Sequence, residues 1–287
     1  PILCGDGANS TSTDSRAPGA RVVLIPFWEK RGLPSSAIEV ISTGVLPVLI
    51  RSTVRPRLVP GGTSPKSTHL REGERLLDLA CGSGVHALRF ARRGLEVVGL
   101  DISPKLVRYC NEQAAAQHLD NVTFVEGDMR ELTFEEEFDA LVILSVSFGF
   151  FDDETNQRVL DGVARALKTG GRLFIQMADL LSFVERNDNR SYWQEREEGI
   201  YLIDSWYDPL TGISYGSFRF LDRDGVLHLW DDTENVRLYT LPEVRGMFDR
   251  AGLEITMVYG DVFLQQPYGP DNHHEMIVVG RKPPRDR

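Results

Sequence analysis

Short apolar runs and segments with helical spacing alternate along most of the chain, from about Leu70 onwards. Seven apolar runs have the length of buried strands, and they cover residues 75–80, 95–100, 122–126, 138–144, 172–177, 253–258 and 275–279. Apolar residues at helical spacing predict helices over residues 85–93, 104–117, 154–168 and 240–251. Because strands alternating with helices are typical of a parallel sheet covered on both faces, we expect an α/β fold. We interpret it as a doubly wound, mostly parallel, seven-stranded sheet with a C-terminal antiparallel strand.

The residues at the helix ends agree with these limits. Gly94 follows the first predicted helix, where a glycine commonly ends a helix. Ser103 is the expected N-cap of the second helix and Pro104 its first residue. Gly170 and Gly171 are expected to end the third helix.

Two parts of the chain depart from the alternating pattern. Strand-like runs separated by turn residues predict a small antiparallel sheet, which we assign to an insert over residues 191–239. We expect it to stand over the carboxyl edge of the parallel sheet and to form one domain with the rest of residues 70–282. Residues 1–69 hold eight of the 15 prolines and have no sustained helical period, which predicts an atypical, poorly ordered segment.

The first predicted strand runs into the turn Cys81-Gly-Ser-Gly84, and a helix follows. Glycines at such a junction let the backbone approach a ligand and leave the first N–H groups of the helix free to face it. The spacing of Gly82, Gly84 and Ala87 also matches the loose dinucleotide fingerprint, which is a weak signal by itself.

Three acids sharpen this signal, since Asp78, Asp101 and Asp128 lie at or near the ends of three successive strands. Strand ends of an open parallel sheet line one crevice, where ligands bind. Asp101 can accept hydrogen bonds from a ribose diol, Asp128 can accept from an adenine amino group, and Asp78 offers negative charge to a cationic ligand.

Residues 75–130 resemble the class I methyltransferases that use S-adenosylmethionine (SAM). The segments LLDLACGSG, VVGLD and EGDM resemble the first three motifs of that family, and FDALVILSVSFGFF resembles the fourth. The resemblance implies that the glycine loop holds the methionine part of SAM and that the backbone near Leu144 and Ser145 faces its amino group. It implies these cofactor-binding residues: Asp78, Ala80, Gly82, Gly84, Asp101, Ile102, Asp128, Met129 and Leu144. Ala80 stands where the family usually has the first glycine of the loop.

A closer resemblance, over roughly residues 70–282, is to small-molecule N-methyltransferases such as amino-sugar N,N-dimethyltransferases. They share CGxGxH, GDMR, a Ser-x-Gly loop and a run like Arg237-Leu-Tyr-Thr-Leu-Pro-Glu243. This implies a small-molecule methyl acceptor, with an amine nitrogen as the expected target. The expected substrate contacts in the insert are Trp193, Arg237 and Tyr239. The sequence identifies no catalytic residue, and His86 is expected to pack rather than to act as a base.

Two alternatives stay open at this point: an NAD(P)-dependent oxidoreductase with the same glycine loop, and a non-catalytic SAM-binding protein. The formal net charge of −10 argues against nucleic acid as a partner. His273 and His274 are adjacent and have no nearby partners that would complete a metal site. Three cysteines without CxxC spacing, and a longest apolar stretch of only residues 37–50, predict a cytoplasmic protein without a membrane span. The oligomeric state is left open between monomer and homodimer.

Overall fold

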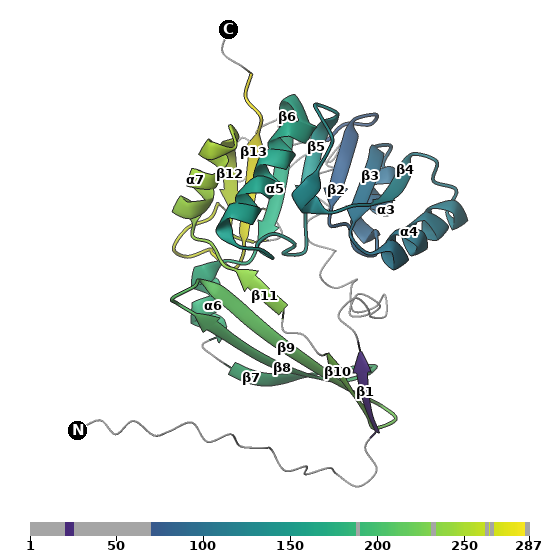
Figure 1. The fold of residues 1–287 in the computed structure, drawn as a ribbon, viewed down its shortest axis with the longest axis vertical. Helices are drawn as coiled ribbons and strands as arrows, with labels where there is room; N and C mark the ends of the chain where they lie inside the picture. Colours follow the sequence, from purple (N-terminus) through teal and green to yellow (C-terminus); the bar gives the residue numbers. More distant parts are fainter. Residues whose placement is uncertain are drawn as a thin grey trace, which may run out of the picture.

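The computed structural model describes residues 21–25, 70–187, 190–230, 234–261, 264 and 267–284, and two sheets organise them (Figure 1). The larger sheet has seven strands in the order β12-β13-β6-β5-β2-β3-β4. These are β2 (Arg75–Leu79), β3 (Glu96–Asp101), β4 (Val122–Glu126), β5 (Phe138–Ile143), β6 (Leu167–Met177), β12 (Glu254–Tyr259) and β13 (Met276–Arg281). The pairs from β6 to β4 are parallel, and β13 runs antiparallel to both β6 and β12. The expected α/β fold with a C-terminal antiparallel strand is confirmed.

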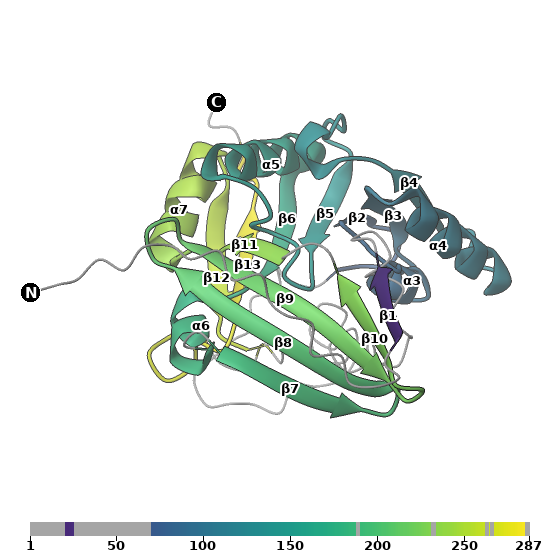
Figure 2. The ribbon, with the colours of Figure 1, turned by 60° about the horizontal axis from the view of Figure 1, so that its bottom comes forward.

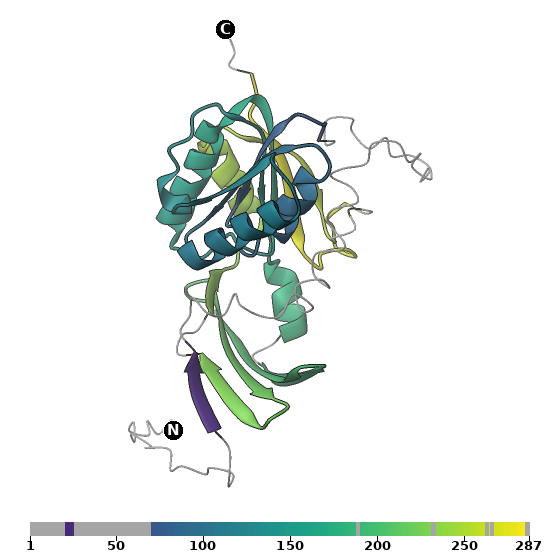
Figure 3. The ribbon, with the colours of Figure 1, turned by 90° about the vertical axis from the view of Figure 1, so that its right-hand side faces the viewer.

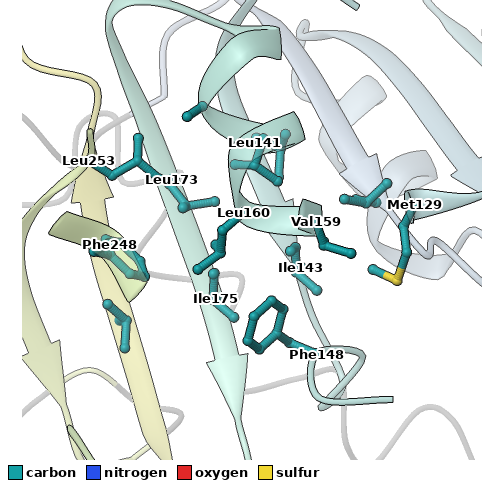
Figure 4. Close-up of a cluster of buried hydrophobic side chains, with 14 of the residues drawn as sticks. Met129, Leu141, Ile143, Phe148, Val159, Leu160, Leu173, Ile175, Phe248 and Leu253 are labelled. Carbon is teal, nitrogen blue, oxygen red and sulfur yellow. The ribbon is translucent and has the colours of Figure 1, made fainter. Parts of the chain in front are cut away.

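Helices cover both faces of this sheet. Apolar side chains of α5 (Asp153–Ala166) and α7 (Leu241–Arg250) pack on one face, in the buried cluster of Figure 4. Side chains of α3 (Val85–Ala91) and α4 (Pro104–Ala116) pack on the other face. Hydrophobic layers on both faces of the sheet therefore hold the strands, and with them the positions of their carboxyl ends.

The helix ends explain why the limits were predictable in some places and wrong in others. The side chain of Ser103 accepts from the backbone nitrogen of Leu106, with Pro104 at the first position of α4, as expected. The third helix ends at Ala166, so its predicted end at the Gly170–Gly171 pair is wrong. Strand β6 already starts at Leu167, because Leu167 pairs with Phe138 at the start of β5.

One helix was not predicted, namely α6 (Leu180–Asn187), which follows the carboxyl end of β6. Its start is fixed by Asp179, whose Oδ1 accepts a 2.8 Å hydrogen bond from the backbone nitrogen of Ser182. Eight residues give too few turns for a clear helical period in the sequence.

The second sheet is the expected insert, and it lies beyond the carboxyl ends of β5 and β6 with α6 beside it (Figures 2 and 3). Its strands are β7 (Arg190–Arg196), β8 (Gly199–Asp208), β9 (Ile213–Asp222), β10 (Val226–Trp230) and β11 (Glu234–Arg237). All pairs among these strands are antiparallel: β7 pairs with β8, β8 with β9, and β9 with both β10 and β11. A further strand, β1 (Arg21–Ile25), pairs parallel to β10. The rest of residues 1–69, where we predicted poor order, lies outside the described residues.

Within the described part of the chain, no helix is both long and apolar enough to cross a membrane. In the same part, no group of three or more His, Cys, Asp or Glu residues is arranged to hold a metal ion.

Candidate functional site

The loop between β2 and α3 is a tight turn in which three residues have a left-handed backbone conformation. Ala80, Gly82 and Gly84 have φ values of 59°, 56° and 73°. A Cβ atom on Gly84 would lie 2.8 Å from Sγ of Cys110 and 2.9 Å from the ring of Phe124. Only glycine fits at that position, and Ala80 holds a conformation that costs a non-glycine residue roughly 1–2 kcal/mol.

Asp101, the last residue of β3, ties this loop to the next one. Its side chain is almost completely buried. Oδ2 accepts a 2.8 Å hydrogen bond from the backbone nitrogen of Gly82, and Oδ1 accepts a 3.0 Å bond from the backbone nitrogen of Ser103. These two bonds fix the carboxylate between the glycine loop and the turn that leads into α4.

Asp78 lies in β2, where it pairs with Val142 of β5, and only 2% of its surface is exposed. Its Oδ2 has no hydrogen-bond partner among the described residues. Burial raises the pKa of this carboxyl to about 7; a backbone hydrogen bond from Ala87 opposes the rise, and the nearby charge of Asp101 adds to it. A buried acceptor without a partner is costly, so a cationic group beside it would be stabilised.

A hollow of about 380 Å³, partly open to solvent, lies beside the carboxyl ends of β3 and β4. Its lining is mostly apolar and includes two acids: Ala80, Leu100, Asp101, Ile102, Gly127, Asp128, Met129, Phe150 and Phe151. Ile102 is 58% exposed although it is a large apolar residue, and Phe150 is also exposed. An apolar hollow with polar groups at its edge is the usual form of a small-molecule site.

Asp128 stands at the rim of the hollow and caps a single 3₁₀ turn, η3 (Met129–Glu131). It accepts from the backbone nitrogen of Arg130 at 2.9 Å and pairs with the guanidinium of the same residue at 2.5 Å. The side-chain hydrogen bond to Arg130 lowers the pKa of Asp128. The guanidinium carbon of Arg130 also lies 4.9 Å from the ring centre of Phe151, so Arg130 contacts both Asp128 and Phe151 at the edge of the hollow.

A strained turn follows β5, beside the glycine loop. The backbone nitrogen of Ser147 donates to the carbonyl of Leu144 at 3.2 Å, and the two residues between them, Ser145 and Val146, have φ values of 56° and 59°. Left-handed backbone in a β-branched residue such as Val146 is a genuine outlier, and such strain costs about 1–3 kcal/mol per residue. Residues of this kind concentrate at ligand sites.

The three residues predicted to contact the substrate lie in different environments. Trp193, in the edge strand β7, is 63% exposed. The guanidinium of Arg237 is mostly buried and pairs with Asp153 at 3.1 Å and with Glu243 at 2.8 Å. The Tyr239 hydroxyl, which is fully buried, donates to Asp153. Direct substrate contact by these residues stays a prediction, and the polar groups of the last two already have protein partners.

The backbone around Arg237 has a clear structural role. Its nitrogen donates a 2.7 Å hydrogen bond to the carbonyl of Gly149, in the loop after β5. A Cβ atom on Gly149 would lie 2.6 Å from the carbonyl oxygen of Arg237. The last strand of the insert is thereby joined to the loop that borders the hollow.

His86 is in the first turn of α3, mostly buried, and its Nδ1 has no partner among the described residues. Burial lowers the pKa of His86 to about 4, and the charge of Arg89 adds to this effect. The imidazole is therefore neutral near pH 7, and its role in packing stays a prediction.

Comparison with known proteins gives one family model, described as a methyltransferase domain, that matches residues 76–171. The cypemycin N-terminal methyltransferase of Streptomyces sp is 31% identical over 216 residues, which are 74% of this chain and 84% of that protein. The putative methyltransferase YqeM of Bacillus subtilis (strain 168) is 28% identical over 69% of this chain and 81% of its own length.

Two solved structures share the fold at low sequence identity. The CcbJ methyltransferase of Streptomyces caelestis is 21% identical, with a TM-score of 0.66 over 74% of this chain and 84% of that one. The SAM-bound amino pentose methyltransferase CalS10 of Micromonospora echinaspora is 22% identical, with a TM-score of 0.54 over 73% of this chain and 84% of that one.

Proposed function

The chain belongs to the SAM-dependent methyltransferases, and we propose that it methylates an amine nitrogen of a small molecule. SAM is its cofactor and methyl donor. The observation that carries the proposed site is the meeting of three strand-end acids at one edge of the sheet, with an apolar hollow between two of them.

We propose that the hollow holds the adenosine part of SAM. Asp101, which lines the hollow at the end of β3, would accept from the ribose hydroxyls. Ile102, Met129 and Phe150 would flank the adenine ring, and Asp128 would accept from its amino group. An exposed isoleucine directly after a buried acid is explained by this arrangement, since an aromatic ring would cover it.

The methionine part of SAM would lie along the residues of the glycine loop, Ala80, Gly82 and Gly84, and towards the turn after Leu144. Glycines there permit close approach of the ligand to the backbone. The unpartnered oxygen of Asp78 supplies a negative charge for the positively charged end of SAM.

SAM supplies a methyl group bound to a positively charged sulfur, so the departing group needs no acid. What the chain contributes is alignment of the acceptor and exclusion of water, and such alignment is worth roughly 7–11 kcal/mol in comparable reactions. An amine acceptor must lose a proton before it attacks, and we assign no residue of this chain to that step.

An amine acceptor is supported by two relatives that the chain resembles, because one is named for N-terminal methylation and another for an amino pentose. The insert adds a half-buried aromatic surface on β8, β9 and β10. The rings of Tyr201 and Phe220 lie 4.7 Å apart, and His228 stacks on Phe220 at 5.6 Å. These rings lie towards the Gly199–Asp222 end of the strand pair, whereas the opposite end, at Ile213, pairs with Arg237 and so lies nearer the hollow. We therefore leave the cluster out of the acceptor site and propose Trp193, Arg237 and Tyr239 as the acceptor contacts.

Calorimetric titration with SAM, S-adenosylhomocysteine and NADH tests the cofactor site. We expect micromolar-range binding of SAM and S-adenosylhomocysteine and no binding of NADH. Stronger binding of NADH would overturn the proposal in favour of an oxidoreductase.

The acceptor is tested by incubating the protein with SAM and a panel of amines, amino sugars and short peptides with free N-termini, and by measuring S-adenosylhomocysteine. Matched alcohols serve as the control set. Turnover with an amine and not with its matched alcohol is the expected result. Tight SAM binding with no turnover on any amine would favour a non-catalytic SAM-binding protein.

A further inference from the structure

The turn after β5 is held in its strained shape by a side chain from the neighbouring strand. Ser145 follows β5 at the point where the ladder with β6 stops, the last pair being Ile143 with Ile175. In place of a backbone partner, the nitrogen of Ser145 donates a 3.0 Å hydrogen bond to Oε1 of Gln176. The side chain of Gln176 therefore continues the strand pairing for one more bond.

Gln176 is an unusual residue for its position. Its side chain belongs to a residue that is only 3% exposed, and the other buried residues of β6 are apolar. Burying an amide is unfavourable unless both its oxygen and its nitrogen find partners. The oxygen bonds to Ser145, and Nε2 donates a 2.7 Å hydrogen bond to Oε2 of Glu275, just before β13.

Glu275 decides which way the amide points. The oxygen and nitrogen of a glutamine side chain are close in shape, so its orientation follows from its partners. An ionised carboxylate only accepts, so it binds the NH₂ group and leaves the oxygen facing the Ser145 nitrogen. Glu275 is itself fixed by its backbone nitrogen, which donates to the carbonyl of Gly260 at 3.0 Å.

We infer that Gln176, oriented by Glu275, is a positioning residue that holds the strained turn at residues 144–147 so that its backbone binds the ammonium group of the methionine part of SAM. This inference rests on the proposed SAM site. The turn lies beside the part of that site proposed for the methionine part of SAM, because β5 pairs with β2 and Asp78 is the partner of Val142. The unpartnered carboxyl oxygen and the turn thus border the same place from adjacent strands.

The test compares two ligands that differ in the methionine part alone. S-adenosylhomocysteine carries the ammonium group, whereas 5′-methylthioadenosine keeps the adenosine and lacks the amino acid. In Gln176→Leu, we expect the affinity for S-adenosylhomocysteine to fall by about 10- to 100-fold and the affinity for 5′-methylthioadenosine to change less than about twofold. Asp101→Asn is the matched control, and it should weaken both ligands.

A double variant provides the rescue. Gln176→Glu alone places two carboxylates side by side and should weaken S-adenosylhomocysteine as Gln176→Leu does. Adding Glu275→Gln restores a donor and acceptor pair while an oxygen still faces the Ser145 nitrogen, so affinity should return to within about threefold of the original. A merely structural role would show as equal losses for both ligands.

The outcomes separate the inference from the proposed site. If the unchanged protein binds neither ligand, the proposed SAM site fails and this inference with it. If it binds both, and Gln176→Leu weakens both equally or neither, the inference alone is overturned. Should Gln176→Leu not fold, as judged by its thermal transition, the single and double variants at residues 176 and 275, which preserve side-chain size, give the same comparison.

Discussion

The backbone nitrogen of Gly82 donates a 2.8 Å hydrogen bond to the carboxylate of Asp101, and this bond joins the ends of two neighbouring strands across 19 residues of sequence. The acid that would bind the ribose is thus the same acid that shapes the loop for the methionine part. Removing it changes the site in two ways at once, which matters for interpreting any variant.

Replacing Asp101 with alanine should weaken SAM binding by one to two decades or more, because hydrogen bonds to charged groups are worth about 1.5–3 kcal/mol each. Calorimetric titration measures the loss. Ser103→Ala is the control, since it removes the cap of α4 and keeps the carboxylate; it should cost about 1 kcal/mol of stability with SAM affinity unchanged. An Asp101→Ala protein that folds and binds SAM normally would show that the acid only organises the loops.

The affinity for SAM should rise with pH. Burial raises the pKa of Asp78 to about 7, so much of this group is protonated below that pH in the free protein. A cationic ligand favours the ionised form, so binding at lower pH must release a proton. We expect affinity to increase from about pH 5 to about pH 7, by up to roughly 100-fold, and then to level off. Calorimetry in buffers of different ionisation enthalpy counts the released proton, and Asp78→Asn should remove the dependence.

The same pKa shift affects the stability of the free protein with the opposite sign. The folded pKa lies above the ordinary value of 3.8, so the folded state binds this proton more tightly than the unfolded state. That contribution to the free energy of unfolding is fully present below the ordinary pKa and is lost as the pH rises to about 7. Urea unfolding should therefore show Asp78→Asn gaining stability relative to the original chain between pH 4 and 8. Parallel curves for the two proteins would contradict the assignment.

Gly84→Ala should abolish measurable SAM binding and destabilise the fold. The added methyl group meets the Cys110 sulfur and the Phe124 ring, in a backbone conformation that already disfavours a side chain. Gly225→Ala is the matched control, since Gly225 has a similar φ of 76° with nothing within 4 Å of the added atom. The control should lose only about 1 kcal/mol and keep SAM affinity. Equal losses of stability in the two variants would mean that the positive φ angle, and not the contacts with Cys110 and Phe124, causes the loss.

Arg237→Ala should act mainly on stability. Its guanidinium is mostly buried between Asp153 and Glu243, so we expect a loss of about 1–3 kcal/mol in the free energy of unfolding. Arg223→Ala, which removes a more exposed pair with Glu195, should lose less than about 1 kcal/mol. Denaturant unfolding of both variants tests the contrast. An Arg237→Ala protein with unchanged stability and impaired turnover would instead support direct substrate contact.

The fold was predictable where local signals agree with the tertiary structure. Asp78, Asp101 and Asp128 come together because three successive apolar strands are neighbours in the sheet, and apolar runs with glycine or proline boundaries are visible in sequence. The start of β6 was missed, because Leu167 extends a helical pattern and joins β5 only through a pairing across the sheet.

The chemistry of the site was less predictable than its position. The raised pKa of Asp78 depends on burial by distant residues, and no pattern around it announces the missing partner. Gln176 and Glu275 are 99 residues apart in sequence. The only local signal was a single amide in an apolar strand, which by itself also fits an edge position. The ion pairs of Arg237 depend in the same way on Asp153, which is far from it in the sequence.

The place of β13 in the larger sheet has a consequence for biosynthesis. This strand lies between β6 and β12, although it follows both in the chain, and five of its six residues are buried. While the ribosome is still adding residues 276–281, β12 has no neighbour to join and the edge of β6 stays open. An open, apolar strand edge is a template for pairing with other chains. Among the described strands, β13 is the last in the sequence and the one that closes the larger sheet, so the facing edges of β6 and β12 stay unpaired until it folds between them.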